Sequence, residues 1–265
     1  MAKVAALQMC ACDDVDRNLA QAALLIAEAS RCSADICVLP EMFSFMGKAL
    51  GDTVSVGESY MTGKVQRFLS NQAKRHQIWV VGGSIPIQRD GSERVRSACL
   101  VYDHTGHEVG RYDKMHLFDV TLSSTESYCE SNYIEPGDTK PIVIETPFGK
   151  IGLAICFDLR FPEFFIALRH AGAEIIVVPA AFTFATGQAH WSLLLRARAI
   201  DTFCYVLGAN QFGQHPSGLS TYGHSMAVDP WGQVLAEHTE ASPGVVLMDV
   251  DLAYLAEIRQ RMPAR

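Results

Sequence analysis

Two segments of the 265-residue chain carry side chains suited to nucleophilic chemistry. Cys156 ends the apolar run Gly149–Ile155 and is followed by Phe-Asp-Leu-Arg-Phe-Pro-Glu, which is typical of a strand, a turn and a helix opened by Pro162. A thiol at such a junction can lie under helix amides, which stabilise a thiolate or an oxyanion. Glu41 follows Leu-Pro at the end of another apolar run. A buried cysteine that only packs is the commoner case, so Cys156 alone does not decide between the two roles.

Two further ionisable residues lie between these segments. Lys114 belongs to the mixed apolar and polar stretch Gly110–Asp119, and Glu130 lies in the turn-rich loop Tyr128–Asp138. Taken alone, Lys114 is compatible with a surface lysine whose stem packs on the neighbouring aromatic residues. Glu130 alone is compatible with an ordinary polar loop.

The elements that must position these residues alternate along the chain. Short runs rich in Val, Ile and Leu alternate with longer amphipathic stretches, which predicts an α/β protein. No Pro/Ser-rich linker or charge run marks a boundary, so we expect one domain over residues 1–265. The runs predicted as buried strands are Val4–Met9, Asp35–Leu39, Ile78–Gly82, Lys150–Ile155, Glu174–Val178, Cys204–Leu207 and Val245–Val250. The predicted helices are Asp16–Arg31, Lys64–His76, Pro162–Ala171 and His190–Thr202.

Two of these strands resemble each other. Ala34–Phe43 and Ala173–Phe182 both have an acidic start, a buried strand and a proline that ends it, at an offset of 173 − 34 = 139 residues. The similarity predicts equivalent strands in two facing sheets, although buried parallel strands also look alike by chance. In this alignment Glu41 stands where the second copy has Ala180. A carboxylate just past a buried strand lies where α/β proteins bind ligands.

Composition and charge exclude several classes of protein. The chain is 49% hydrophobic and 19% charged with a formal net charge of −7, which argues against binding to nucleic acid or an anionic membrane. The N-terminal residues lack the apolar core of a signal peptide, and no run approaches the ~20 apolar residues of a membrane helix. We therefore expect eight reduced cysteines and a cytoplasmic protein.

Other motifs indicate less. Gly223-His-Ser225 resembles a serine-hydrolase elbow, but a strand and a turn are expected after it rather than a helix. Cys10 and Cys12 do not form a zinc set of familiar spacing. His104 and His107 flank a turn and are expected to be exposed. No glycine-rich phosphate loop occurs, so nucleotide binding is not supported. We expect no metal and no other cofactor.

Taken together, Leu-Pro-Glu41, Tyr-Asp-Lys114-Met-His and Cys156-Phe-Asp-Leu-Arg-Phe-Pro-Glu closely resemble, in this order, the Glu–Lys–Cys signature of the nitrilase superfamily of carbon–nitrogen hydrolases. The resemblance runs from the first strand to about residue 255. Further segments resemble the Nit branch of that family, which includes deaminated-glutathione amidases. These segments are His190-Trp191, Leu195–Asp201, Tyr222–Met226 and Asp229–Gly232.

The resemblance implies how an amide would be hydrolysed through a thioester. Cys156 would be the nucleophile, and Glu41 the general base that later returns the proton to the leaving amine. Lys114 and the backbone N–H of Phe157 would form the oxyanion hole. Glu130, where the family has a second glutamate, would hold Lys114 or the hydrolytic water. A nearby Lys114 cation is also expected to lower the pKa of Cys156.

The resemblance also implies substrate contacts at Arg160, Phe182 and Thr186. Arg160 would bind a substrate carboxylate, and the alternative is an ion pair with Asp158 or Glu163. Phe182 and Thr186 would supply an aromatic wall and a hydroxyl donor, while Phe182 could equally be plain core.

The implied fold is a four-layer αββα sandwich that forms homodimers or higher homo-oligomers. By analogy, the interface would involve the helix His190–Thr202 and the segment after Ala253. The implied substrate is a small-molecule amide, as in the repair of deaminated glutathione. An ω-amidase acting on α-keto acid amides is the alternative within the family. A non-catalytic interaction protein with the same fold is the alternative outside it, although the intact Glu41, Lys114 and Cys156 argue against that.

Overall fold

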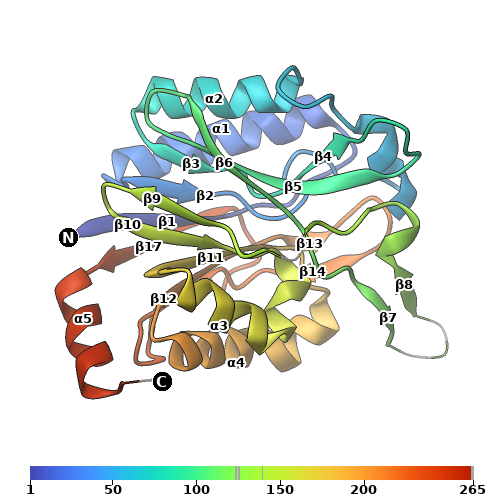
Figure 1. Cartoon of the computed structure of the whole chain (residues 1–265). Coiled ribbons are helices and arrows are strands. Elements are labelled where there is room, and N and C mark those ends of the chain that lie inside the picture. The colour runs from blue at the N-terminus through green and yellow to red at the C-terminus, as the bar shows by residue number, and fades with distance from the viewer. Residues whose placement is uncertain (123, 125, 139, 264–265) are drawn as a thin grey trace.

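Two β-sheets lie face to face, with helices on their outer faces (Figure 1). The structure is a computed structural model that describes residues 1–122, 124, 126–138 and 140–263. In order across the first sheet, the strands are β17 (Gly244–Val250), β1 (Ala2–Gln8), β2 (Ile36–Val38), β3 (Trp79–Val81), β5 (Val95–Tyr102) and β4 (Ile85–Gln88), with β6 (Glu108–Asp113) paired to β5. Across the second, they are β16 (Val234–Glu237), β15 (Met226–Val228), β12 (Tyr205–Asn210), β11 (Ile175–Ala180), β10 (Gly149–Leu153) and β9 (Val143–Thr146).

Five α-helices and two small hairpins complete the described part of the chain. Helices α1 and α2 cover the first sheet, and α3 and α4 cover the second, which gives the four-layer αββα sandwich expected from the sequence (Figure 1). The helices are α1 (Val15–Arg31), α2 (Lys64–His76), α3 (Pro162–His170), α4 (Phe184–Thr202) and α5 (Leu252–Arg261). The hairpins are β7 (Asp119–Thr121) with β8 (Ser127–Cys129), and β13 (Phe212–Gln214) with β14 (Ser220–Tyr222). Short 3₁₀ turns are η1 (Leu50–Val56), η2 (Glu130–Asn132) and η3 (Cys156–Arg160).

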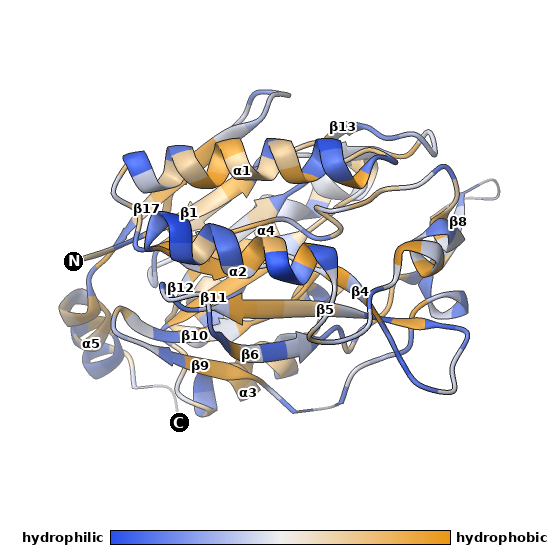
Figure 2. Cartoon of the chain, turned by 90° about the horizontal axis from the view of Figure 1, so that it is seen from above, coloured by the Kyte–Doolittle hydropathy of each residue, from blue (hydrophilic) through white to orange (hydrophobic). Residues whose placement is uncertain are grey.

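The strands of the first sheet are buried on both faces, as their apolar sequences require. Along β1, Val4 and Ala6 belong to the core between the sheets, whereas Ala5 and Leu7 belong to the core under α1 and α2. This alternation follows from the two-residue period of a strand. Figure 2 shows the complementary pattern on α1 and α2, where polar and apolar residues alternate because only one side of each helix is buried.

The two sheets repeat one arrangement. In each, a parallel trio of strands (β1–β2–β3 and β10–β11–β12) is flanked by antiparallel neighbours. In both sheets, the acidic residue before the second strand of the trio accepts a hydrogen bond from the backbone of the first strand. Asp35 accepts from the backbone N–H of Lys3, and Glu174 accepts from that of Lys150, each at 2.8 Å. These carboxylates are related by the expected offset, 174 − 35 = 139 residues. The internal similarity therefore corresponds to equivalent strands in facing sheets.

Most sequence-based boundaries hold, and the misses have physical reasons. All seven predicted strands and four predicted helices occur, but α4 begins at Phe184 rather than at His190. Pro179 lies inside β11 instead of ending it, since the strand continues to Ala180. Strands β4, β5, β6 and β9 and helix α5 were not predicted. No helix in the described ranges is long and apolar enough to cross a membrane.

Candidate active site

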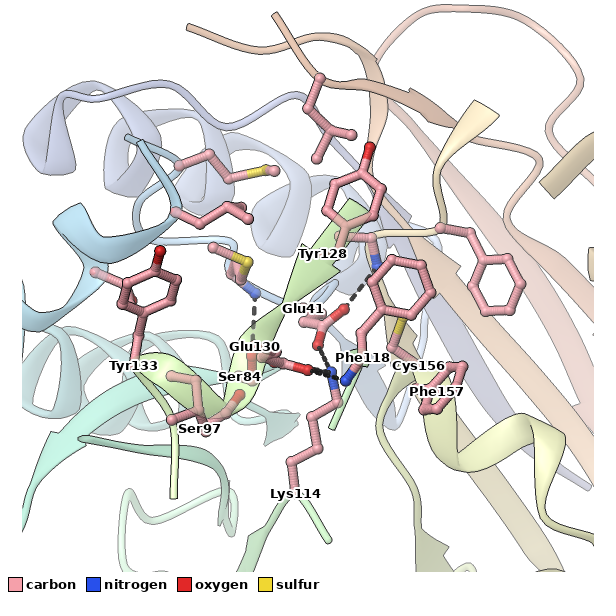
Figure 3. Close-up of a pocket in the computed structure, with 18 of the residues that line it drawn as sticks. Glu41, Ser84, Ser97, Lys114, Phe118, Tyr128, Glu130, Tyr133, Cys156 and Phe157 are labelled. Atoms are coloured by element: carbon pink, nitrogen blue, oxygen red, sulfur yellow. Dashed lines mark hydrogen bonds and ion pairs between the residues drawn. The ribbon is translucent and has the colours of Figure 1, made fainter. Parts of the chain in front are cut away.

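The residues singled out from the sequence meet at one end of the sandwich (Figure 3). Glu41 follows β2, Lys114 follows β6, and Cys156 follows β10. Parallel strands of the two sheets end here together, and Met9 after β1 forms a bridge to Gln211 after β12. The strand ends therefore bring residues that are far apart in the sequence into one cleft.

Glu41 is held by contacts on both carboxylate oxygens and is only 3% exposed. Its Oε1 accepts from Lys114 Nζ at 2.7 Å, and its Oε2 accepts from the backbone N–H of Ala181 at 3.0 Å. The backbone carbonyl of Glu41 also accepts from the Gln211 amide at 3.0 Å. Because Ala181 and Gln211 follow strands of the second sheet, both sheets fix this carboxylate.

Lys114 is buried, with 2% of its side chain exposed, and its ammonium lies between two carboxylates. Nζ is 2.7 Å from Glu41 Oε1 and 3.0 and 2.9 Å from the two oxygens of Glu130. Burial alone would lower the pKa of Lys114, but Glu130 and Glu41 outweigh it and raise the pKa well above its usual value. Lys114 therefore stays a cation, and the surface-lysine interpretation is wrong.

Glu130 has contacts beyond Lys114. Its Oε2 also accepts from the backbone N–H of Phe118 at 2.6 Å. Its side chain is 20% exposed, yet it is surrounded by protein atoms, and this burial raises its pKa against the opposing effect of Lys114. The carboxylates of Glu130 and Glu41 thus together hold the ammonium (Figure 3).

Cys156 begins the 3₁₀ turn η3, and its backbone φ of +46° lies in the left-handed region. Non-glycine residues adopt this region rarely, and strained backbone of this kind clusters at functional sites. The thiol is 8% exposed. Because η3 lies between Cys156 and α3, which begins at Pro162, the backbone amides next to Cys156 belong to η3 rather than to α3.

Lys114 lowers the pKa of Cys156, as expected from the sequence, but other effects outweigh it and the net pKa is raised. Burial, and after it the charge of Glu41, raises the pKa of Cys156 well above its ordinary value. Lys114 and the backbone N–H of Ala181 act in the opposite direction but are outweighed. This environment therefore favours the neutral thiol of Cys156 over the thiolate.

Asp158 ties the turn of Cys156 to the segment of Lys114. This fully buried carboxylate accepts from the backbone N–H of Ile155 at 2.8 Å and from the Tyr112 hydroxyl at 2.7 Å. It also accepts from the backbone N–H of His116 at 3.1 Å and contacts its Nδ1 at 2.7 Å. Sequence reasoning treated Asp158 only as a possible partner of Arg160. The motif Tyr-Asp-Lys-Met-His, which brings Tyr112 and His116 alongside Lys114, was the signal for this role.

Arg160 makes neither of the ion pairs considered from the sequence. Within the described part of the chain, no carboxylate lies within salt-bridge distance of its guanidinium. Its nearest polar partner is Nδ1 of His190 at 3.2 Å, and the rings of Phe157 and Phe182 lie 5.7 and 5.6 Å from its guanidinium carbon. Burial lowers the pKa of Arg160. This half-buried cation is therefore available to an anion in the cleft.

Phe182 and Thr186 also line the cleft, where α4 begins. Phe182 is 4% exposed and packs against Trp191 at a centroid distance of 5.0 Å, so it belongs to the core as well as to the cleft wall. The Thr186 hydroxyl lies 2.8 Å from that of Thr183, the N-cap of α4. The ring of Phe157 packs edge-on against Phe118.

The space in and in front of the cleft is about 980 Å³ with open solvent included, and most of the cleft wall is apolar. Most of this wall was not predicted from the sequence, because its residues come from loops, short turns and strand ends with no chemical signal of their own. They include Met42, Phe45, Met46, Leu50, Ser84, Ile85, Phe118, Tyr128, Tyr133 and Leu219. Met42 resembles Cys156 in having a positive φ, of +54°, and its N–H donates to Ser84 Oγ at 3.1 Å.

The weaker motifs behave as expected. Ser225 is fully buried and precedes strand β15, so no elbow forms there. His104 and His107 are exposed. Within the residues that the structure describes, no three His, Cys, Asp or Glu side chains are grouped as metal ligands would be.

Comparisons with known proteins agree with the geometry. A family model described as carbon–nitrogen hydrolase matches residues 3–260. The deaminated glutathione amidase of Homo sapiens is 40% identical over 263 residues, which cover 98% of this chain and 80% of that protein.

Two solved structures extend the comparison. Nit3 of Saccharomyces cerevisiae, described as a member of branch 10 of the nitrilase superfamily, superposes with a TM-score of 0.89 at 30% identity, covering 99% of this chain and 94% of that one. An amidase mutant from Nesterenkonia sp. AN1, with acrylamide added to its active-site cysteine, gives a TM-score of 0.82 at 26% identity over 99% of this chain and 98% of that one.

The non-catalytic alternative is excluded, because a hydrolase family model matches nearly the whole chain and an amidase is 40% identical to it. The protein is a hydrolase of carbon–nitrogen bonds other than peptide bonds, of the amidase type, and the chain belongs to the carbon–nitrogen hydrolase family of the nitrilase superfamily.

Proposed function

We propose that Cys156, Glu41 and Lys114 carry out amide hydrolysis through a thioester, with Glu130 as the partner that holds Lys114. The observation that carries the proposal is the buried Glu41–Lys114–Glu130 chain, with contacts of 2.7 to 3.0 Å, in the cleft that also contains the Cys156 thiol. Support also comes from the Nesterenkonia amidase, in which acrylamide has added to the active-site cysteine.

The first step follows from the protonation states. Because the thiol of Cys156 has a raised pKa, Glu41 takes its proton as the sulfur attacks the amide carbonyl carbon. A new C–S bond forms, and the carbonyl π electrons move to oxygen. Lys114 Nζ and the backbone N–H of Phe157 stabilise this oxyanion, since the first amides of a helical turn have no partner within the turn.

Collapse of this intermediate breaks the C–N bond. Glu41 returns the proton to the leaving nitrogen, which departs as an amine or ammonia, and the acyl group remains on Cys156 as a thioester. Glu41 then takes a proton from water as the water oxygen attacks the thioester. Release of the acid and transfer of the proton to sulfur restore the thiol. Glu130 keeps Lys114 in place throughout.

For the substrate, we propose an amide of the deaminated-glutathione type. The human relative, a deaminated glutathione amidase that is 40% identical to this chain, supports this choice. So does Arg160, a half-buried cation in the cleft wall between Phe157 and Phe182, which suits the carboxylate of an α-keto acid. Thr186 offers a hydroxyl on the same wall. An ω-amidase acting on α-ketoglutaramate is the second candidate, because this smaller amide has the same acyl half.

The test is product analysis with both substrates side by side. We expect purified protein to release the amine half of deaminated glutathione with a higher kcat/KM than it releases ammonia from α-ketoglutaramate. Preference for α-ketoglutaramate would make the protein an ω-amidase. Activity that EDTA abolishes and zinc restores would contradict our proposal that no metal or other cofactor takes part.

We further propose that residues 1–265 act as one domain and pair as a homodimer or higher homo-oligomer. Large apolar side chains of α4 and the β15–β16 turn support pairing: Leu193 is 66%, Ile200 46% and Trp231 52% exposed. Leu193 and Ile200 lie in the helix His190–Thr202 that the sequence analysis suggested as part of the interface, and Trp231 adds to the exposed apolar surface. Sedimentation of the Leu193→Glu variant should yield monomers if this face is the interface, and an unchanged mass would exclude it.

We also propose a cytoplasmic location. All eight cysteines are free, which suits a reducing compartment. Cell fractionation with an antibody to the protein tests this proposal, and recovery from an oxidising compartment would contradict it.

A further inference from the structure

A second, open hollow, with about 1120 Å³ of space when open solvent is included, adjoins the mouth of the catalytic cleft. The two spaces share four lining residues, so they are continuous rather than separate. The shared residues are Leu50, Tyr128, Thr183 and Leu219. Arg160 and the three catalytic side chains line only the inner space.

The floor of the outer hollow is apolar and partly open to solvent. Phe184, the first residue of α4, is 51% exposed, and Leu50 in η1 is 37% exposed. The Phe184 ring packs edge-on against Tyr222 at 5.8 Å, which limits its freedom to collapse elsewhere. An exposed aromatic residue in a fixed position next to a catalytic cleft is a surface suited to a ligand.

The hollow also carries one cation and one anion. Lys48 is 79% exposed, and its only ion pair within the described residues is with Asp13 at 3.7 Å. Such exposed pairs contribute little, so Lys48 is free to bind another anion. The anion is Glu126, whose Oε1 accepts from the Tyr128 hydroxyl at 2.8 Å. This bond directs the carboxylate toward the cleft boundary.

We propose that the outer hollow is the subsite for the amine half of the substrate, and that it takes peptide-like amines that end in a carboxylate. The inference rests on the proposed function. With the acyl half near Arg160 and the carbonyl carbon at Cys156, the leaving half must extend toward the mouth of the cleft. There Leu50 and Phe184 contact its side chain, and Lys48 binds its terminal carboxylate.

The subsite also sets specificity. A primary amide such as α-ketoglutaramate releases only ammonia and has nothing to fill the outer hollow. An amide that extends from the same acyl group gains contacts there, so the hollow favours the extended amide over the primary one. Specificity for the amine half is thus separated from the chemistry at Cys156.

The experiment compares kcat/KM for three substrates: deaminated glutathione, the same compound with its terminal carboxylate converted to a carboxamide, and α-ketoglutaramate. In Lys48→Ala, the preference for deaminated glutathione over α-ketoglutaramate should fall about two- to five-fold, as expected for one exposed ion pair. Lys48→Glu should lower it further. The carboxamide should be the poorer extended substrate for the wild type and should show no dependence on residue 48.

Lys74→Ala is the matched control, because it removes the same charge from the exposed face of α2. Its substrate preference should equal that of the wild type. Phe184→Ala tests the apolar floor and should lower the preference for both extended substrates alike.

The possible failures are distinct. If the wild type hydrolyses deaminated glutathione but Lys48→Ala and Phe184→Ala keep the wild-type preference, the subsite is wrong and the proposed function stands. If the wild type does not hydrolyse deaminated glutathione at all, the proposed function is wrong, and the proposed subsite is then wrong as well because it depends on that function.

Discussion

The two sheets present nearly the same framework to the active site but equip it differently. In both, a lysine-bearing strand (β1 or β10) lies parallel to a strand preceded by an acidic residue (β2 or β11), with a 2.8 Å bond between them. Aligned through Lys3 and Lys150, Met9 corresponds to Cys156, since 150 − 3 = 156 − 9. Aligned through Asp35 and Glu174, Glu41 corresponds to Ala180.

The first half therefore supplies the proposed base and the second half the proposed nucleophile. Ala181, beside the alanine that replaces the glutamate, contributes its backbone N–H to Glu41. Lys114 follows β6, which pairs with β5 as β16 pairs with β15 in the second sheet, but the residues directly after β16, His238–Ser242, include no lysine. The two sheets therefore share a framework of strands, whereas the chemistry depends on a few side chains that differ at equivalent strand ends.

The largest effect is expected from substitution of Cys156, and substitution of its counterpart Met9 is the control. Cys156→Ala should abolish turnover with the fold retained, because no other thiol takes its place in the cleft. Met9→Leu keeps the volume of a fully buried side chain and should retain activity, at a stability cost below about 1.5 kcal/mol. Steady-state kinetics and circular dichroism measure both. Substantial turnover by Cys156→Ala would contradict the assignment of the nucleophile.

Lys114 sharpens the comparison because it follows β6, whereas no lysine directly follows the corresponding strand β16. Lys114→Met removes the oxyanion donor and should lower kcat about 10²-fold or more. It also leaves Glu41 and Glu130 without their cation, which destabilises the fold, so a thermal melt must show that the variant is folded. A folded variant with wild-type kcat would exclude Lys114 from the oxyanion hole.

The next prediction concerns Arg160, which lies in the turn η3. This turn follows β10 in the second sheet, whereas the equivalent strand of the first sheet, β1, leads to α1 without such a turn. Arg160→Ala should raise KM for keto-acid amides about 10-fold, the loss expected for a charge-assisted hydrogen bond. Arg160→Lys keeps the charge but not the planar guanidinium, and should lie between the wild type and the alanine variant. An unchanged KM in both variants would remove Arg160 from the substrate contacts.

The smallest effects test the shared framework itself. Asp35→Ala and Glu174→Ala each remove one carboxylate bond to a neighbouring strand and should each lower the free energy of unfolding by about 1 kcal/mol. Neither should change kcat, because both residues lie at the strand starts, away from the cleft. Urea unfolding gives the two values, and a large difference between them would show that the repeated contacts are not equivalent.

Much of the framework was predictable because buried strands and amphipathic helices have clear periods. The strand runs around Val4, Ile36 and Ile175 were recognised from apolar content alone. Strand β6 was missed because its residues Glu108–Asp113 are mostly half-exposed and polar, so the position of Lys114 came only from the family resemblance.

The electrostatics were harder to predict than the residue types. The sequence predicted that Lys114 lowers the pKa of Cys156 and that Glu130 holds Lys114 or the hydrolytic water, but it did not predict the contact of Lys114 with Glu41 or the effect of burial on the thiol. In the structure Lys114 contacts Glu41 and Glu130, and burial decides the pKa of Cys156. Similarly, Asp158 was a candidate partner for Arg160, yet its oxygens already accept from Ile155, Tyr112 and His116. How many partners a buried group has depends on tertiary contacts that no local pattern encodes.

The central claim is that Glu41 takes the proton of Cys156, and Glu41→Gln tests it most directly. The measurement is the pH dependence of iodoacetamide labelling at the Cys156 peptide, followed by mass spectrometry, together with amide hydrolysis by the same protein. Because the charge of Glu41 raises the pKa of Cys156, its removal should lower the apparent pKa of labelling while hydrolysis falls about 10²-fold or more. Hydrolysis that survives the substitution, or an apparent pKa that rises, would contradict the role of Glu41 as the base.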